Sequence, residues 1–471
     1  MSKRGVTGRP GRRMKGLSAE GNVRHALPGP AAEQGRDCHI VCGVLRCVAI
    51  YDYIAFCAGF QAGFFIVRRQ VLPFPAGQNC LPGTSPPLPH TMGTGRAARP
   101  GAAPGRTGKG SVPMKQYKVG VVGATGMVGQ RFVTLLADHP WFRLTALAAS
   151  ARSAGKTYAE AVGPRWAMST PMPEQVKDMV VLDAADVNAV ASQVDFVFCA
   201  VNMKKEEIKA LEEAYAKAEC PVVSNNSAHR MTPDVPMVVP EINADHIEII
   251  PAQRRRLGTK RGFIAVKSNC SLQSYVPALH PLRGYGITEC LVCTYQAISG
   301  AGKTFETFPD ILDNVIPYIG GEEEKSEQEP LKLWGHIEGD RIVPADGPSF
   351  TAQCLRVPVS DGHMGAVFVR FEKKPAKEEI LKAWAEFRGP AQELNLPSAP
   401  KQFLHYFSEP DRPQPKLDRM LENGMAVSIG RLREDTQYDY KFVCLSHNTL
   451  RGAAGGAVLL AELLAAKGYF D

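Results

Sequence analysis

Cys270 lies in the segment VKSNCSLQS, residues 266–274, between an asparagine and a serine and directly after a short apolar run. A cysteine nucleophile needs a lowered thiol pKa, an acid or base within reach and donors that stabilise an oxyanion. We expect a helix after Cys270, and the start of a helix favours a thiolate. Cys270 is also one of twelve cysteines, and a single cysteine is often a small apolar core residue. Residue type alone leaves both interpretations open.

Candidate partners for Cys270 lie in three later segments. YQAISGAGK contains Gln296 and a glycine turn, LRVPVSDGHMG contains Arg356 and His363, and GGEEEKSE contains an acidic run that ends at Lys325. Such groups can position, polarise and protonate a bound acyl group. Each also has an ordinary structural explanation, as a turn histidine, a surface arginine or a solvated helix face. The partners make Cys270 a candidate nucleophile without deciding the question.

The segment GATGMVG places Gly123, Gly126 and Gly129 three residues apart, between a strand-like apolar run and an amphipathic, helix-like segment. Glycines let the chain turn tightly and bring backbone N–H groups close to a pyrophosphate, and the helix start adds positive potential. The alternative is a strand–helix turn without a ligand. The position at the start of a domain favours a dinucleotide site.

The end of the second expected strand, AASARSAGK, carries Ser150, Arg152 and Ser153 and no acidic residue. Sites for NAD usually place an acidic residue here to bind the ribose 2′-hydroxyl, whereas an arginine accommodates the 2′-phosphate of NADP. The segment therefore predicts NADP(H) as the cofactor. A polar loop without a ligand is the alternative.

Alternating strand-like and helix-like segments must position these residues. From residue 117, apolar runs such as YKVGVVG and DFVFCAV alternate with amphipathic segments such as KEEIKALEEAYAKA. This alternation is typical of an α/β fold with a Rossmann-type, doubly wound parallel sheet. After residue 266 the strand-like segments become longer, which indicates a second, mixed α+β domain.

We expect three parts in the chain. Residues 114–266 form the NADP-binding domain, which a small-residue helix within 447–471 completes, and residues 267–446 form the catalytic domain. Residues 1–113 are rich in glycine, proline and arginine, so we expect them to be disordered or to result from a start site assigned upstream of Met114. A transit peptide is a third interpretation of this extension.

The basic balance of the chain lies in its first segment. Residues 1–113 hold 15 of the 55 basic and 4 of the 47 acidic residues, which leaves 40 basic and 43 acidic residues in 114–471. A nucleic-acid-binding role for the main part therefore lacks electrostatic support. No uninterrupted apolar run is long enough to span a bilayer, so we expect no membrane partner.

The cysteines of residues 114–471 are scattered and lack the spacing of metal ligands. Cys290 and Cys293 form a CxxC pair, but the pair lies in a strand-like segment without a second pair or a histidine cluster. We therefore expect core cysteines and no metal site. A large chain with scattered cysteines is typical of the reducing cytoplasm.

The ordered set of these segments resembles the aspartate-β-semialdehyde dehydrogenase family, especially its archaeal and fungal-like branch. The resemblance extends from residue 116 to residue 470 and is carried by GATGMVGQRF, ASARSAGK, SNNSAHRM, VPEIN, SNCS, QAISGAGK, DNVIPYIGGEEEK, RVPVSDGH and NTLRGAAGG. It implies a homodimer or homotetramer that assembles through the second domain. Leu272 departs from the family, which commonly has threonine there, and residues 1–113 have no counterpart in the family pattern.

The resemblance also implies roles for individual residues. Cys270 matches the nucleophile, His363 the acid/base and Gln296 the residue that positions the acyl-enzyme. Arg356 matches the arginine that holds the substrate α-carboxylate, a task that suits a bidentate guanidinium. Glu322 matches the carboxylate that recognises the substrate amino group, although the register across three successive glutamates stays open.

Further positions match phosphate, substrate and cofactor contacts of the family. Lys325 matches a phosphate-binding lysine, and Arg230 and Asn269 match phosphate or substrate contacts. The positions that match the NADP site are Gly123, Thr125, Gly126, Met127, Val128, Gly129, Ser150, Arg152, Ser153, Ser299, Gly300 and Asn448.

The activity that the resemblance implies is the reduction of an acyl phosphate. Cys270 attacks L-aspartyl 4-phosphate, phosphate leaves, and NADPH reduces the thioester to L-aspartate 4-semialdehyde, a step towards lysine (through diaminopimelate), methionine and threonine. The alternatives are malonyl-CoA reductase, N-acetylglutamyl-phosphate reductase and a catalytically inactive NADP-binding interaction protein. Glu322 argues for the aspartate substrate, and the presence of Cys270 and His363 argues against an inactive protein.

Overall fold

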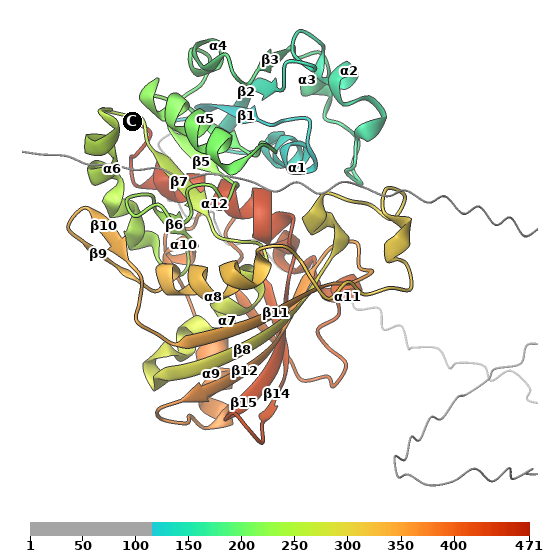
Figure 1. Ribbon diagram of the computed structural model, residues 1–471, viewed down its shortest axis with the longest axis vertical. Coiled ribbons are helices and arrows are strands. Elements are labelled where there is room, and N and C mark those ends of the chain that lie inside the picture. Colours follow the sequence, from blue (N-terminus) through green and yellow to red (C-terminus); the bar gives the residue numbers. More distant parts are fainter. Residues whose placement is uncertain (1–114) are drawn as a thin grey trace, which may run out of the picture. The chain divides into compact units, whose positions relative to one another are not determined.

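A computed structural model describes residues 115–471, which build two β-sheets with helices around them (Figure 1). The prediction made for residues 1–113 lies outside the described residues. The expected fold class is confirmed, because a Rossmann-type parallel sheet is joined to a part built on a mixed sheet. None of the helices between residues 115 and 471 has the length and apolar composition needed to cross a membrane. The residue limits of the two domains stay a prediction.

The first sheet is parallel throughout, with the strand order β3-β2-β1-β4-β5-β7-β6. Its strands are β1 (Tyr117–Val122), β2 (Phe142–Ala149), β3 (Val181–Asp183), β4 (Phe196–Cys199), β5 (Val222–Ser224), β6 (Met237–Val238) and β7 (Ile264–Lys267). The strands are largely runs of valine, phenylalanine, isoleucine and alanine, because both faces of the sheet are buried. The glycine turn follows β1 at the carboxyl edge, where doubly wound sheets bind ligands.

Helices between the strands cover the parallel sheet. They are α1 (Met127–Leu136), α2 (Tyr158–Val162), α3 (Glu174–Lys177), α4 (Val187–Ala191), α5 (Lys205–Lys217) and α6 (Ile250–Leu257). The last helix of the chain, α12 (Gly455–Ala466), returns to this sheet and contacts β5, β7 and α1 (Figure 1). Its residues are apolar nearly all round, which suits a helix that is buried on all sides.

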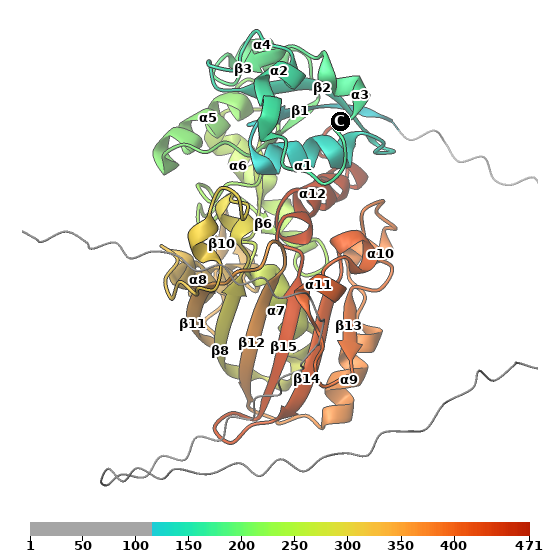
Figure 2. The same cartoon turned by 90° about the vertical axis from the view of Figure 1, so that its right-hand side faces the viewer.

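The second sheet is mixed, with the strand order β11-β8-β12-β15-β14-β13 (Figure 2). Its strands are β8 (Ile287–Gln296), β11 (Ser349–Arg356), β12 (His363–Phe371), β13 (Leu404–Phe407), β14 (Val427–Glu434) and β15 (Tyr440–Ser446). Helices α7 (Leu272–Leu279) and α9 (Lys377–Glu386) pack on one face. Buried and partly exposed residues alternate along β12, as expected for a sheet that has one covered and one open face.

Helix α8 (Glu322–Leu333) lies along β11, the edge strand of the mixed sheet. Glu327 Oε1 accepts a hydrogen bond from Ala352 N at 3.1 Å, and Glu323 Oε1 accepts one from Cys354 N at 3.1 Å. The carboxylates thus pair backbone donors that an edge strand otherwise leaves open. The remaining elements are a hairpin of β9 (His336–Glu338) and β10 (Arg341–Val343) and the short helices α10 (Pro390–Glu393) and α11 (Pro415–Asp418).

A buried ion pair fixes the turn that precedes α12. Arg451 donates from Nη1 and Nη2 to the two carboxylate oxygens of Glu241, at 2.6 and 2.5 Å, and from Nε to Gln273 Oε1 in α7 at 2.9 Å. Its guanidinium also lies 4.4 Å from the ring centroid of Phe403. Both charged side chains are almost completely buried. The pair therefore ties the C-terminal segment to both α7 and the loop that follows β6.

We predict that Glu241→Gln lowers the free energy of unfolding by about 3 kcal/mol, because it leaves the Arg451 charge buried without its counter-ion. The measurement is urea unfolding followed by circular dichroism. The control is Asp340→Asn, which removes a pair with Arg255 whose side chains are 73% and 63% exposed, and we expect no measurable change from it. Equal midpoints for the two variants would contradict the importance of the buried pair.

Candidate active site

The turn between β7 and α7 carries Cys270. Asn269 Oδ1 accepts hydrogen bonds from Ser271 N at 2.7 Å and from Ser271 Oγ at 2.8 Å, which fixes the turn directly before the helix. Gly452 packs against the other side of Cys270, since a Cβ added to Gly452 would lie 2.9 Å from Cys270 Cβ. Only a glycine permits this approach without a shift. Cys270 taken as a whole residue remains partly exposed.

Glu322, the first residue of α8, is buried beside this turn. Its carboxylate accepts hydrogen bonds from Asn269 Nδ2 at 3.0 and 3.1 Å, from Gln296 Nε2 at 3.3 Å and from Lys325 Nζ at 2.7 Å. Burial by itself would raise the pKa of Glu322, but Lys325 and the two amide donors outweigh burial and lower the pKa below its ordinary value. Glu322 is therefore a carboxylate at neutral pH.

The structure shows which of the three successive glutamates lies beside the Cys270 turn. Gly321 adopts the left-handed conformation, with φ of +68°, and α8 begins directly after it. Glu322 then faces the Cys270 turn, Glu323 binds the backbone of β11 and Glu324 is exposed. Glu322 is thus the glutamate that lies in the site.

Arg356 and His363 both bind the backbone of Ala297, one at its carbonyl and the other at its amide. Arg356 ends β11 and donates from Nη1 to Ala297 O at 2.8 Å, and His363 begins β12 and accepts at Nδ1 from Ala297 N at 3.0 Å. A Cβ added to Gly300 would lie 3.0 Å from Arg356 Nη1 and from His363 Cε1 and Nε2. The glycine turn after Gln296 therefore permits a close approach to both side chains.

His363 is a neutral hydrogen-bond donor in this structure. Its burial, followed by the charge of Arg356, lowers its pKa to about 3. Because Nδ1 accepts from the Ala297 amide, we assign the proton of the neutral ring to Nε2. Within residues 115–471, Nε2 is buried and has no hydrogen-bond partner. The Nε2–H group is free to bind an oxygen atom that a substrate brings.

Cys270 is a thiol in this structure. Burial of the sulfur, and then the negative charge of Glu322, raise its pKa, whereas Lys267, Arg230 and Arg356 lower it without cancelling the rise. The effect that we expected from the start of α7 is therefore opposed by the surroundings of the sulfur. Ionisation of Cys270 depends on the cations around it.

Two buried charges near Cys270 escaped the sequence analysis. Glu329 accepts from Arg230 Nη1 at 3.0 Å and from Asn269 N at 2.6 Å, so it links a predicted substrate contact to the Cys270 turn. It lies seven residues after Glu322 on the same face of α8, and this helical spacing could have revealed it. Lys267 lies at the end of an apolar strand, where a charge is unusual.

Direct contacts and shared neighbours connect the residues that we predicted for catalysis and substrate binding. The connected residues are Asn269, Cys270, Gln296, Glu322, Lys325, Arg356, His363 and, through Glu329, Arg230. Their individual roles stay predictions.

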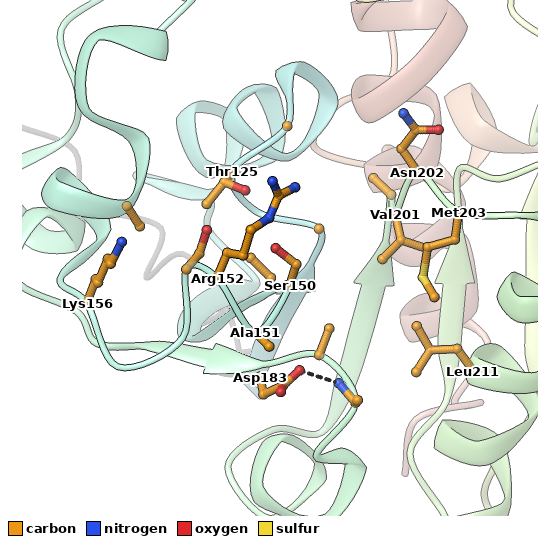
Figure 3. A pocket seen from close by; sticks show the side chains of 18 of the residues that line it. Thr125, Ser150, Ala151, Arg152, Lys156, Asp183, Val201, Asn202, Met203 and Leu211 are labelled. Carbon is orange, nitrogen blue, oxygen red and sulfur yellow. Dashed lines mark hydrogen bonds between the residues drawn. The ribbon is translucent and has the colours of Figure 1, made fainter.

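A second feature is a cavity of about 820 Å³ at the carboxyl edge of the parallel sheet. Six of the predicted cofactor residues line it: Gly123, Thr125, Gly126, Ser150, Arg152 and Ser153. Figure 3 shows Thr125, Ser150 and Arg152 on one side and Val201, Asn202 and Met203 on the other. Lys156 and Asp183 also line the cavity and were not predicted, although Lys156 lies in the same segment as Arg152.

The glycine turn has the shape that a dinucleotide phosphate requires. Gly123 has φ of +92°, and a Cβ on it would lie 2.5 Å from Ala200 O. A Cβ on Gly129 would overlap the carbonyl of Gly123. Met127 and Val128 form the first turn of α1, whose amides lack partners inside the helix. The cavity, these amides and the cation of Arg152 fit the phosphates of NADP(H).

Three predicted cofactor residues lie elsewhere. Ser299, Gly300 and Asn448 do not line the cavity but lie on the His363 side, because Gly300 contacts His363 and Asn448 Nδ2 donates to Ser299 Oγ at 2.8 Å. Asn448 Oδ1 also accepts from Gly362 N at 2.8 Å, directly before His363. The predicted cofactor residues therefore form two sets.

The chain is similar to known proteins of one family. Two family models match the chain, the NAD binding domain of semialdehyde dehydrogenase at residues 118–250 and the dimerisation domain of semialdehyde dehydrogenase at residues 279–451. The chain is similar to the aspartate-semialdehyde dehydrogenases of Aspergillus fumigatus (45% identity, 76% of this chain and 99% of the relative) and Archaeoglobus fulgidus (44%, 74% and 98%). A crystal structure of aspartate semialdehyde dehydrogenase with NADP from Candida albicans superimposes with a TM-score of 0.68 (40% identity, 75% of this chain and all of that chain).

We predict that the His363 ring stays neutral from about pH 5.5 to about pH 9, because its pKa lies far below this range. The measurement is a proton–carbon NMR titration of protein labelled with ¹³C-histidine. His363→Asn assigns the signal by its loss. A chemical-shift step centred near pH 6.5 would show that the ring is solvated and would contradict the buried donor.

Proposed function

The chain belongs to the semialdehyde dehydrogenase family, and from this we propose that it is an NADP-dependent aspartate-semialdehyde dehydrogenase. It reduces L-aspartyl 4-phosphate to L-aspartate 4-semialdehyde and releases phosphate, a step in lysine, methionine and threonine biosynthesis. The observation that carries the proposal is the convergence of one thiol, one ionised carboxylate and several cations around the Cys270 turn.

The charges of the site suit each charged group of this substrate. Glu322, which is ionised, binds the substrate ammonium, and Arg356 holds the α-carboxylate with its planar guanidinium. Lys325 and Arg230 bind the phosphate. When the substrate binds, Lys325 gives up its hydrogen bond with Glu322 and binds the phosphate instead. Arg230 keeps its ion pair with Glu329 and binds the phosphate with its remaining N–H donors.

Cys270 divides the displacement of phosphate into two easier steps. The thiolate attacks the acyl carbon, the bond between that carbon and the phosphate oxygen breaks, and phosphate leaves with a proton from water. The acyl group then remains on Cys270 as a thioester. Gln296, which is held by Glu322, positions this group.

His363 acts on the oxygen of the thioester. Its Nε2–H lies beside Gly300, where the backbone leaves room, and donates a hydrogen bond to the acyl oxygen as negative charge develops there. The same bond is present when the carbon–sulfur bond breaks and Cys270 returns to a thiolate. His363 therefore works as a neutral donor in both steps.

NADP(H) is the cofactor that the two predicted sets of residues accommodate. The glycine turn and the first turn of α1 would hold the pyrophosphate, and Ser150, Arg152 and Ser153 would hold the 2′-phosphate. Ser299 and Asn448, which are bonded to each other, would hold the nicotinamide end. When bound, NADPH supplies the hydride that reduces the thioester.

The alternative functions account for fewer of the charged residues in the site. Malonyl-CoA has no ammonium group for Glu322, and in N-acetylglutamyl phosphate the amino group is acylated and uncharged. An inactive NADP-binding protein has no use for a connected set of Cys270, Gln296 and His363. The relatives named above are also aspartate-semialdehyde dehydrogenases.

We predict that the purified full chain oxidises aspartate semialdehyde in a phosphate-dependent manner with NADP⁺ and more slowly with NAD⁺, measured by absorbance of the reduced nicotinamide. Cys270→Ala lowers turnover at least about a thousandfold, because the covalent route is lost. The same variant binds NADPH with unchanged affinity in fluorescence titrations. The control is Cys293→Ala, which removes another partly exposed thiol and keeps the activity. Activity with malonyl-CoA but not with phosphate and the semialdehyde would refute the proposal.

The open face of the mixed sheet supports a homodimer as the assembly. Residues 279–451 match a dimerisation domain, and Leu291, Cys293, Met364, Ala366 and Phe368 are partly exposed on this face. A contiguous, partly apolar sheet face is typical of a subunit interface. A homotetramer requires a further contact between two such dimers.

We predict that Ala366→Glu shifts the protein from dimer to monomer in sedimentation velocity, because two-fold symmetry brings equal charges together at a self-complementary interface. The control is Lys382→Glu on the exposed side of α9, which leaves the sedimentation coefficient unchanged. A wild-type monomer at micromolar concentration would contradict the proposed assembly.

The cytoplasm is the compartment that we propose for this enzyme. Cys199, Cys220, Cys270, Cys290, Cys293, Cys354 and Cys444, the cysteines among residues 115–471, are all free thiols. Free thiols in this number are typical of proteins that work in a reducing compartment.

A further inference from the structure

Asp183 is an acidic residue in the cavity to which the proposed function gives no role. It ends β3 and lines the cavity together with Arg152 and Lys156, whose cations suit a phosphate. Within residues 115–471, its carboxylate receives one hydrogen bond, from Ala185 N to Oδ1 at 3.0 Å (Figure 3). A carboxylate repels a phosphate, so Asp183 suits a different part of the ligand. Its Oδ2 is available to a donor that the ligand brings.

The strand order determines which part of NADP(H) reaches Asp183. The glycine turn after β1 suits the pyrophosphate, and the residues after β2 suit the 2′-phosphate on the ribose that carries the adenine. β3 is the next strand of the sheet, and Asp183 pairs in register with Ala149, directly before Ser150. A 2′-phosphate held after β2 therefore brings the ribose, and the adenine attached to it, to the end of β3. The nicotinamide is at the other end of the cofactor.

Apolar side chains line the cavity around this position. In Figure 3, Ala151 and Asp183 lie on one side of the cavity, and Val201, Met203 and Leu211 lie on the other. Met203 is 47% exposed, so a ring that packs against it removes apolar surface from water. Mostly apolar walls with a single acceptor suit a flat heteroaromatic ring, whereas a sugar or a phosphate needs several polar partners.

The chemistry of the carboxylate selects one edge of such a ring. An ionised aspartate accepts hydrogen bonds and donates none. Adenine carries an exocyclic amino group, which is a donor, whereas hypoxanthine and guanine carry a carbonyl oxygen at the same ring position. A carboxylate placed at that edge binds the amino group and repels the carbonyl oxygen. Asp183 thus suits adenine better than it suits the other two purines.

Two other roles for Asp183 make a different prediction. Its Oδ1 fixes the turn before α4 through the bond from Ala185 N, but this bond uses one oxygen and does not depend on a nucleotide. An acidic residue can also bind ribose hydroxyls, but that residue usually lies at the end of the second strand, where this chain has Ser150. Both roles predict equal effects on nucleotides that differ only in the base.

We propose that Asp183 determines the base specificity of the cofactor site, because its Oδ2 accepts a hydrogen bond from the exocyclic amino group of adenine. Val201, Met203 and Leu211 cover one face of the ring. The inference rests on the proposed function, since it requires NADP(H) as the ligand of the cavity. Binding of the nucleotide can be measured without the substrate and without turnover.

The test is isothermal titration calorimetry of the full chain with NADP⁺ and with its hypoxanthine analogue, in which a carbonyl oxygen replaces the amino group of adenine. We expect the wild type to bind NADP⁺ at least about tenfold more tightly, because the analogue offers no amino donor to the carboxylate. Asp183→Asn brings the two affinities within about threefold of each other, because its amide donates to the carbonyl oxygen and its own oxygen keeps the bond with Ala185 N.

Asp186→Asn is the matched control, because Asp186 follows in the same loop, accepts from Ala189 N at 3.1 Å and does not line the cavity. It leaves both affinities unchanged. Equal affinities of the wild type for the two nucleotides would overturn the inference, and this comparison needs no variant. Equal weakening of both nucleotides in Asp183→Asn would also overturn it, because that result indicates a role in the turn or at the ribose.

The proposed function and the inference fail in different ways. A wild type that prefers NADP⁺ to the analogue but lacks phosphate-dependent turnover supports the inference and refutes only the proposed activity. Normal turnover with equal affinities refutes only the inference. Failure to bind either nucleotide refutes both.

Discussion

Two carboxylates of α8, seven residues apart, hold the turn that carries Cys270. Glu322 binds the side chain of Asn269, and Glu329 binds its backbone amide. Since one helix face supplies both, a rotation of α8 would disturb the nucleophile, the substrate carboxylate and Arg230 at once. The left-handed Gly321 and the bonds from Glu323 and Glu327 to β11 fix that rotation. The chemistry of the site therefore depends on how a helix lies against an edge strand.

The negative charge of Glu322 also determines which other charges the site requires. A buried, ionised Glu322 suits a substrate ammonium, but its charge opposes a thiolate nearby. His363 cannot compensate, because burial and Arg356 keep it neutral. The positive charge must come from lysine and arginine side chains, whose burial is tolerated where carboxylates and carbonyls surround them. A charged nucleophile near a buried carboxylate thus requires compensating positive charges rather than a single activating base.

The C-terminal segment joins the two sheets at the nucleophile. α12 packs on the parallel sheet, the Arg451–Glu241 pair fixes the turn before it, and Gly452 in that turn contacts Cys270. Asn448, shortly before, binds Ser299 and the amide that precedes His363. A β-carbon on Gly452 would clash with Cys270 Cβ, and one on Gly300 would crowd the side chains of Arg356 and His363. The end of the chain is therefore part of the site and not only of the domain that binds the dinucleotide.

Local patterns in the sequence predicted the fold class, the glycine turn after β1 and the cofactor, and the family suggested by the motifs is confirmed. These features depend on neighbours within one strand–turn–helix unit, so residue spacing is enough to reveal them. The tertiary structure alone decided which of the glutamates 322–324 enters the site, brought Glu329 to Arg230 and set Gly452 against Cys270. The residues of these contacts are at least 53 positions apart in the sequence. Periodicity carries no information over such separations, because the packing of α8, β11 and α12 determines which side chains meet.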